Sequence, residues 1–131
     1  MAVESTGYAF NRTRQCYLAT DLRLAATHWS RFLGLMGRNA RSFPAGKALW
    51  IVPSRGVHTF AMRFPIDVAY LNKDKVVIHI EEALKPWRVA PVRMATSSVL
   101  ELPSETLRST GTRIGDTLDI TVGQGIGVAG S

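Results

Sequence analysis

The sequence predicts an α+β, β-rich fold: a single compact domain with a mostly antiparallel or mixed, barrel-like sheet and two short helices. The chain has 131 residues, which is the size of one domain. Six or seven short apolar runs are separated by Gly, Pro, Asn and Asp, as strands between turns are. The connections between these runs are turns and loops rather than full crossover helices, which favours antiparallel or mixed pairing.

The chain is expected to divide into three parts. Residues 1–13 are predicted to be a flexible N-terminal segment, 14–122 the single β-rich domain, and 123–131 a Gly-rich flexible tail. At the start of the domain, "QCYLATDLRLAAT" alternates weakly and carries polar residues at its centre. This pattern favours two short strands around a turn at Thr20–Asp21.

Two segments have helical patterns. In residues 27–37, Thr27 is a typical N-cap, apolar side chains recur every three or four residues, and Gly37 is a plausible C-cap. The segment "PSETLRSTG" begins with Pro and Ser and ends at Gly111, which predicts one or two helical turns.

The remaining apolar runs predict strands. "ALWIVPS" indicates a buried strand that ends at Pro53. Residues 66–71 and 76–80 flank the polar turn "NKDK", so they predict a hairpin. "VLEL" predicts another strand, and the last one follows a turn at Gly115–Asp116. In that last strand one face is apolar, formed by Leu118, Ile120 and Val122.

The charge of the chain and its single cysteine indicate which binding partners and which cellular compartment to expect. Over residues 1–96, fourteen Lys and Arg stand against six acidic residues, and the whole chain carries +6. Such an excess attracts acidic partners, so a nucleic acid or another polyanion is one possible partner. Cys16 is the only cysteine, which suits a reducing compartment and excludes an intramolecular disulfide. With no signal-peptide pattern and no run of 18 apolar residues, the expectation is a cytoplasmic chain without a membrane span.

The stretch "GVHTFAMRFPIDVAYL" places polar groups among apolar neighbours and is the first candidate site. If residues 57–62 are extended, one face carries His58, Phe60 and Met62. A two-residue loop at 63–64 brings Asp67 to that face, whereas a three-residue loop at 63–65 places it on the opposite face. In the first case Asp67 would orient His58 as a general base or metal ligand; in the second it is a buried carboxylate that pairs with backbone amides or with Arg63.

A second candidate is Glu101, which lies between Leu100 and Leu102 in "VLELP". It could face solvent. If it is buried it needs a partner, and Arg31 or Arg38 would suit because arginine binds carboxylates in a bidentate fashion. His58 and one carboxylate make half of a zinc site, which needs three or four ligands. The fold would have to add His79 and Glu101, so no metal site is predicted.

Three ordered segments resemble signatures of a known family. They are "AAT" with "RFLGLMGR", "VHTFAMRFPIDVAYL", and "VLELPSETLRSTGTRIGDTLDI". Together they resemble domain of unknown function 192, also called the UPF0127 family, over roughly residues 15–122. The resemblance implies a compact β-rich domain with little helix, and it implies no established reaction, substrate or cofactor. The matching residues are Thr27, Arg31, Gly34, Leu35, Met36, Arg38, His58, Thr59, Met62, Pro65, Asp67, Glu101, Leu102, Gly115 and Asp116.

These features favour a non-catalytic domain that binds a small molecule or a protein partner, with no catalytic or metal-binding residue assigned and no cofactor identified. The predicted ligand-binding residues are His58, Phe60, Met62, Asp67, Glu101, Arg31 and Arg38. One alternative is a hydrolase or metal-dependent enzyme that uses His58 with Asp67 and Glu101. The other is a binder of nucleic acid or another polyanion through the basic N-terminal two-thirds of the chain.

Overall fold

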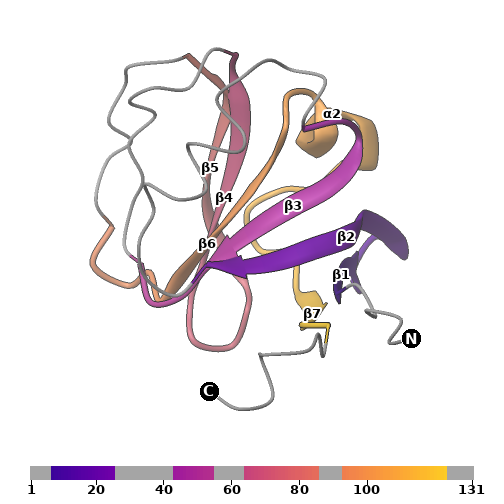
Figure 1. Cartoon of the computed structure of the whole chain (residues 1–131). Helices are drawn as coiled ribbons and strands as arrows, with labels where there is room; N and C mark the ends of the chain where they lie inside the picture. Colours follow the sequence, from indigo (N-terminus) through magenta and orange to yellow (C-terminus); the bar gives the residue numbers. More distant parts are fainter. Residues whose placement is uncertain (1–6, 26–42, 55–63, 86–92, 124–131) are drawn as a thin grey trace.

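The computed structural model describes residues 7–25, 43–54, 64–85 and 93–123. Within them the chain forms seven strands and one helix, drawn in Figure 1. The elements are β1 (Gly7–Asn11), β2 (Cys16–Ala25), β3 (Gly46–Ile51), β4 (Ile66–Leu71), β5 (Val77–Leu84), β6 (Ser98–Pro103), α2 (Thr106–Thr110) and β7 (Leu118–Thr121). The helix expected over residues 27–37 lies outside the described residues.

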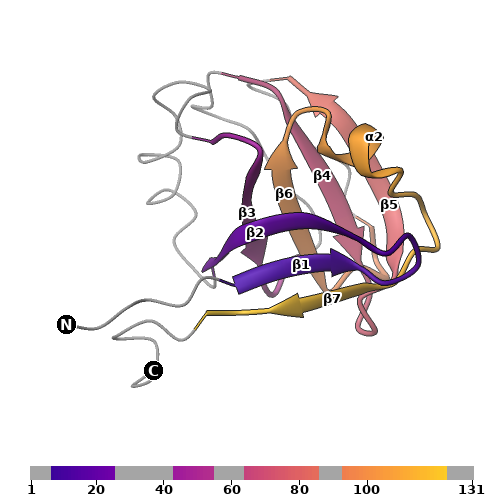
Figure 2. The ribbon, with the colours of Figure 1, turned by 90° about the vertical axis from the view of Figure 1, so that its right-hand side faces the viewer.

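The seven strands form one curved sheet in the order β5-β4-β6-β3-β2-β1-β7, a half-barrel whose curvature is clear in Figure 2. The pairing of β2 with β3 is parallel, and the other pairs of named strands are antiparallel. The predicted β-rich, mixed, barrel-like domain is therefore confirmed. The hairpin expected from the "NKDK" turn is also present, as β4 and β5.

Two expectations near the N-terminus are wrong. The sequence predicts a turn at Thr20–Asp21, but β2 runs unbroken through it, and the register with β1 and β3 shifts there instead. A bulge can absorb an extra residue without ending the strand, so the polar pair is accommodated inside β2. The segment predicted to be flexible through residue 13 contains β1, which is held between β2 and β7.

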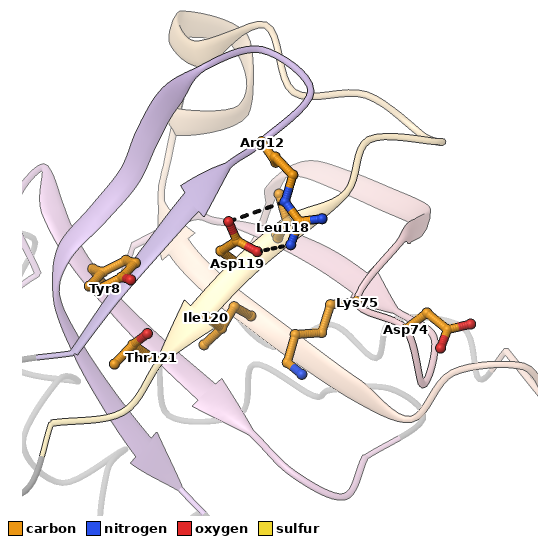
Figure 3. A pocket seen from close by; sticks show the side chains of 8 residues that line it. All are labelled: Tyr8, Arg12, Asp74, Lys75, Leu118, Asp119, Ile120 and Thr121. Atoms are coloured by element: carbon orange, nitrogen blue, oxygen red, sulfur yellow. Dashed lines mark hydrogen bonds and ion pairs between the residues drawn. The ribbon is translucent and has the colours of Figure 1, made fainter.

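The first and last strands are neighbours in the sheet. β1 pairs with β7 from Tyr8–Thr121 to Asn11–Leu118, and Arg12 forms an ion pair with Asp119 just beyond (Figure 3). Gly7 has no room for a side chain, because a Cβ there would collide with the carbonyl oxygen of Thr121. The two edges of the half-barrel also meet at one end, where the bridge Val76–Thr117 links the residue before β5 to the residue before β7.

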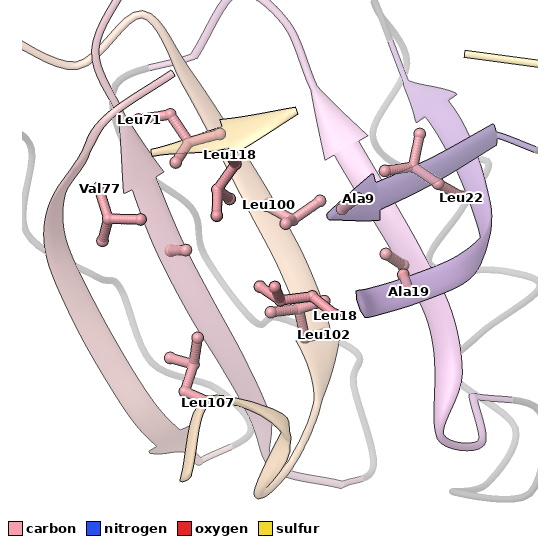
Figure 4. Close-up of a cluster of buried hydrophobic side chains, with 12 residues drawn as sticks. Ala9, Leu18, Ala19, Leu22, Leu71, Val77, Leu100, Leu102, Leu107 and Leu118 are labelled. Carbon is pink, nitrogen blue, oxygen red and sulfur yellow. The ribbon is translucent and has the colours of Figure 1, made fainter. Parts of the chain in front are cut away.

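The sheet buries both of its faces over β4 and β6. One face packs under α2, with Leu71, Leu100, Leu102 and Leu107 among its buried side chains (Figure 4). We call it the α2 face; Leu118, Ile120 and Val122 belong to it, as the sequence predicts. The other face carries a second apolar cluster of Phe43, Leu49, Phe64, Ile66, Val68, Tyr70 and Val99. We call it the Glu101 face, because that residue lies on it.

The short helix α2 follows the sequence prediction at its C-terminal end. Gly111 is the C-cap in a left-handed conformation with φ 69°, a geometry that favours glycine. At the other end, Glu105 also has a left-handed φ of 74° and makes no side-chain capping hydrogen bond. The first turn of α2 is therefore capped by another part of the molecule.

Candidate functional site

The structure places two of the seven predicted ligand-binding residues. Asp67 and Glu101 are both fully buried, on the adjacent strands β4 and β6. The other five lie outside the described residues: Arg31, Arg38, His58, Phe60 and Met62. Whether Asp67 shares a face with His58 therefore stays a prediction.

Asp67 and Glu101 face opposite sides of the sheet. In the pairing of β4 with β6, Asp67 lies opposite Leu102 and Val68 lies opposite Glu101. Paired residues project to the same face and successive residues alternate, so Asp67 belongs to the α2 face. The register thus separates two carboxyl groups that the sequence grouped into one candidate site.

Asp67 is held by backbone amides on both oxygens. The N–H of Leu107 donates to Oδ2 at 2.9 Å, and the N–H of Ala83 donates to Oδ1 at 2.8 Å. The first bond caps α2, which lacks a side-chain cap of its own. The second holds a bulge, because two residues of β5 lie between the partners of Ile66 and Val68 where β4 has Asp67 alone. Asp67 therefore ties three elements together.

Glu101 has the opposite environment. It is 0% exposed and lies between Leu49 of β3 and Val68 of β4. Neither carboxyl oxygen has a hydrogen-bond partner among the residues that the structure describes. Burial raises the pKa of Glu101 well above its ordinary value of 4.5, since an apolar surrounding disfavours the charged form. Burial therefore favours the neutral carboxylic acid form of this side chain, which can both donate and accept a hydrogen bond.

Three more polar side chains lie on the Glu101 face: Tyr70 on β4, and His79 and Glu81 on β5. Glu81 of β5 is paired with Val68, and the neighbouring pair is Tyr70 with His79. His79 Nε2 lies 2.6 Å from Glu81 Oε2, and the His79 ring meets the Tyr70 ring edge-on at 4.9 Å between centroids. Burial, and then the negative charge of Glu81, raises the pKa of Tyr70 to about 12 against a smaller opposing effect of Arg93.

The turn "RIGDTL", to which the sequence assigns no chemistry, holds a buried carboxylate. Asp116 is 2% exposed and accepts hydrogen bonds from Asn11 at 2.9 Å, Arg14 at 3.0 Å and the N–H of Arg113 at 3.0 Å. Burial alone would raise its pKa, but these bonds and the charge of Arg14 lower it below 3.8. The network joins the β1–β2 turn to the segment before β7.

Two further observations concern metal binding and membrane spanning. In the described ranges, no group of three or more His, Cys, Asp or Glu side chains is placed to hold a metal ion. Among the same residues, no helix is long and apolar enough to cross a membrane.

The family of this chain follows from a match to a known family profile. A sequence profile for DUF192, described as "Uncharacterized ACR, COG1430", matches residues 9–120. The chain belongs to the DUF192 family. The resemblance drawn from the three ordered segments is confirmed.

Two relatives of this DUF192 chain are named as UPF0127 proteins. A UPF0127 protein of Pyrococcus furiosus is 30% identical over 114 residues, covering 83% of this chain and 94% of that protein. A UPF0127 protein of Pyrococcus abyssi is 25% identical over 118 residues, covering 86% of this chain and 97% of its own length. Both relatives match along nearly their whole lengths, so the likeness concerns the entire domain.

Two solved structures share the DUF192 fold seen here. A protein of unknown function from Novosphingobium aromaticivorans superposes with a TM-score of 0.71 at 17% identity, covering 90% of this chain and 93% of that one. A Sinorhizobium meliloti protein, described only provisionally as a transcription regulator, gives 0.70 at 20% identity, covering 92% and 98%. At these identities the likeness establishes the fold alone.

The polar row beside Val68 is what sequence reasoning missed in this DUF192 chain. The sequence points to His79 only as a residue that the fold would have to add to a metal site, and it predicts no role for Tyr70 or Glu81. The predicted hairpin could have revealed these neighbours, because antiparallel pairing around "NKDK" places residue 79 opposite 70 and residue 81 opposite 68. The register of β4 with β5 shifts at two bulges, and a single sequence does not show where such shifts occur.

Proposed function

We propose that this chain is a non-catalytic binding domain that holds a small molecule on the Glu101 face. One observation carries the proposal: the fully buried carboxyl of Glu101, without a hydrogen-bond partner in the described part of the chain. A buried polar group left without a partner costs about 1–3 kcal/mol of stability. Native proteins contain few such groups, and a ligand is one way to satisfy them.

The surroundings of Glu101 suit a mostly apolar ligand with one polar group. Leu49 and Val68 flank it on the neighbouring strands, and the same cluster holds Phe43 and Phe64, whose ring centroids lie 6.2 Å apart. Small-molecule sites combine apolar and aromatic walls with a few polar groups that fix orientation. A neutral carboxylic acid pairs best with an amide, an alcohol or another carboxylic acid, because each exchanges hydrogen bonds without burying a charge.

Of the predicted ligand-binding set, the proposal rests on Glu101. His58, Phe60, Met62, Arg31 and Arg38 stay predictions for the same site. Asp67 is assigned to holding α2 and β5, because both of its oxygens already accept backbone hydrogen bonds. The lone Cys16 suits a reducing compartment, so we place this function in the cytoplasm.

A thermal-shift screen tests the proposal with neutral amides, alcohols and small carboxylic acids as probes. A compound that binds the folded protein alone raises its Tm by mass action. We expect hits on the unaltered protein that lose their effect in Glu101→Leu, which keeps the size of the side chain and removes both oxygens. Glu82→Gln is the matched control, since Glu82 is a half-exposed carboxylate on β5.

Two results would overturn the proposal. One is a set of hits that stabilise Glu101→Leu as much as the unaltered protein. The other is a screen in which no compound raises the Tm of the unaltered protein, which would leave Glu101 as a buried acid without a ligand role. His58→Ala, tested with the same hits, reports separately on the predicted residue outside the described ranges.

A further inference from the structure

A second surface, unrelated to Glu101, draws attention on the solvent side of the β1–β2 hairpin. Tyr8 and Phe10 alternate along β1 with the buried residues Ala9 and Asn11, so both rings point outward. Tyr17 of β2 is paired with Phe10 and is 55% exposed. These three rings form what we call the aromatic face.

The three rings of the aromatic face are in direct contact. The centroid of the Tyr17 ring lies 4.9 Å from that of Phe10 and 5.8 Å from that of Tyr8, with interplanar angles of 66° and 79°. Edge-to-face contacts of this kind keep rings in fixed orientations. The large side chains of β1 are thus outside while small ones are inside, the reverse of an ordinary half-buried strand.

Three partly exposed arginines lie on β2 or in the turn between β1 and β2, and each is paired with an aspartate. Arg12 pairs with Asp119, Arg14 with Asp116 and Arg23 with Asp21, and their side chains are 61%, 36% and 64% exposed. Beside Tyr8, a shallow groove of about 340 Å³ runs along β7 and is lined by Arg12, Lys75 and Thr121 among others (Figure 3). Asp119 also lines it, but the positive charges of Arg12 and Lys75 both act on its carboxylate.

We propose that the aromatic face binds single-stranded nucleic acid. Aromatic rings on a sheet surface stack with unpaired bases, and neighbouring cations follow the phosphate backbone. The excess of fourteen cations over six acids in residues 1–96 gives the long-range attraction that such binding needs. A duplex keeps its bases stacked inside, so it offers nothing to these rings.

Fluorescence anisotropy on the full chain tests this proposal with labelled oligothymidylate and oligouridylate of about 12 nucleotides, a length within the range that one such domain covers. Stacking contributes about 1–3 kcal/mol per base, so Tyr17→Ala is expected to weaken binding about 5- to 150-fold. Tyr17→Trp retains a ring and is expected to bind about as well as the unaltered protein. Met94→Ala removes an exposed apolar side chain from the loop before β6 and should change nothing.

The outcomes separate the alternatives. Binding that weakens with added salt, falls in Tyr17→Ala and is kept in Tyr17→Trp supports the proposal. Equal affinity for a duplex, or unchanged binding in Tyr17→Ala, overturns it, because the cations alone would then account for binding. No rise in anisotropy up to about 100 µM protein at low salt also overturns it and leaves the aromatic face for a protein partner. None of these results bears on Glu101, which lies on other strands and is buried.

Discussion

Asp67 and Glu101 make an instructive comparison, because the same chemical group is fully buried on neighbouring strands in opposite circumstances. Asp67 faces α2, and each of its oxygens accepts a backbone hydrogen bond. Glu101 faces the other side of the sheet, and neither oxygen has a partner in the described ranges. Burial alone therefore does not distinguish a carboxyl group with a structural role from one that is available to a ligand. The hydrogen-bond partners of the two oxygens distinguish them.

The largest expected effect is on the satisfied carboxylate. Asp67→Ala removes two hydrogen bonds and leaves the buried N–H of Leu107 and the partly buried N–H of Ala83 without their acceptors. We expect the free energy of unfolding, measured by urea denaturation, to fall by about 3–5 kcal/mol. Asp67→Asn keeps one oxygen acceptor and should lose less. A loss under about 1 kcal/mol in Asp67→Ala would mean that other groups cap α2.

The next effect is the pH dependence of the unsatisfied carboxyl. Because its pKa in the folded state is raised above 4.5, the folded protein retains this proton where the unfolded chain releases it. The stability due to protonated Glu101 is complete below pH 4.5 and is lost as pH rises toward the folded-state pKa. Compared with Glu101→Gln, the unaltered protein should lose stability at up to about 1.4 kcal/mol per pH unit between pH 4.5 and the folded-state pKa.

Paired urea titrations of the two proteins between pH 4.5 and 7.5 measure this difference. The comparison between variants cancels the other titrating groups, including Asp116, whose contribution has the opposite sign because its folded-state pKa is lowered. A constant difference across that range would show that Glu101 is charged and paired in the folded protein.

The smallest expected effect is a gain in stability. Well below pH 4.5, where the carboxyl is protonated in both the folded and the unfolded chain, Glu101→Leu replaces an unsatisfied carboxyl between Leu49 and Val68 with an apolar side chain of similar size. We expect the free energy of unfolding to rise by about 1–3 kcal/mol. Leu100→Ala on the same strand serves as the contrasting variant and should destabilise by about 2–5 kcal/mol. A destabilised Glu101→Leu would contradict the absence of a partner.

Most of the strands were predictable because their signals are local. The turn "NKDK" marks the β4–β5 hairpin, and Gly111 marks the end of α2 by the conformation that it adopts. β1 was missed because its large residues Tyr8 and Phe10 face outward while Ala9 and Asn11 are buried, so its pattern does not indicate a core strand. The continuity of β2 through Thr20–Asp21 depends on a bulge, which a single sequence does not reveal.

The candidate site was harder to predict because it depends on register. Asp67 and Glu101 are both buried carboxyl groups, and the apolar residues around them in the sequence are the only local signal of that burial. Their assignment to opposite faces follows from the pairing of β4 with β6, where a shift of one residue would reverse it. The two backbone donors to Asp67 come from residues 16 and 40 positions away, so no local pattern announces them.

The pairing of β1 with β7 has a consequence for how the protein is made. Asn11 donates to Asp116 across 105 residues of sequence, and β1 reaches its second neighbour only when β7 is present. During synthesis the hairpin of β1 and β2 can form early. The other edge of β1 stays unpaired until β7 has been synthesised, which requires nearly the whole chain. A chain interrupted before residue 118 would therefore leave the outer edge of β1 without its partner strand, and such an open edge can pair with other chains.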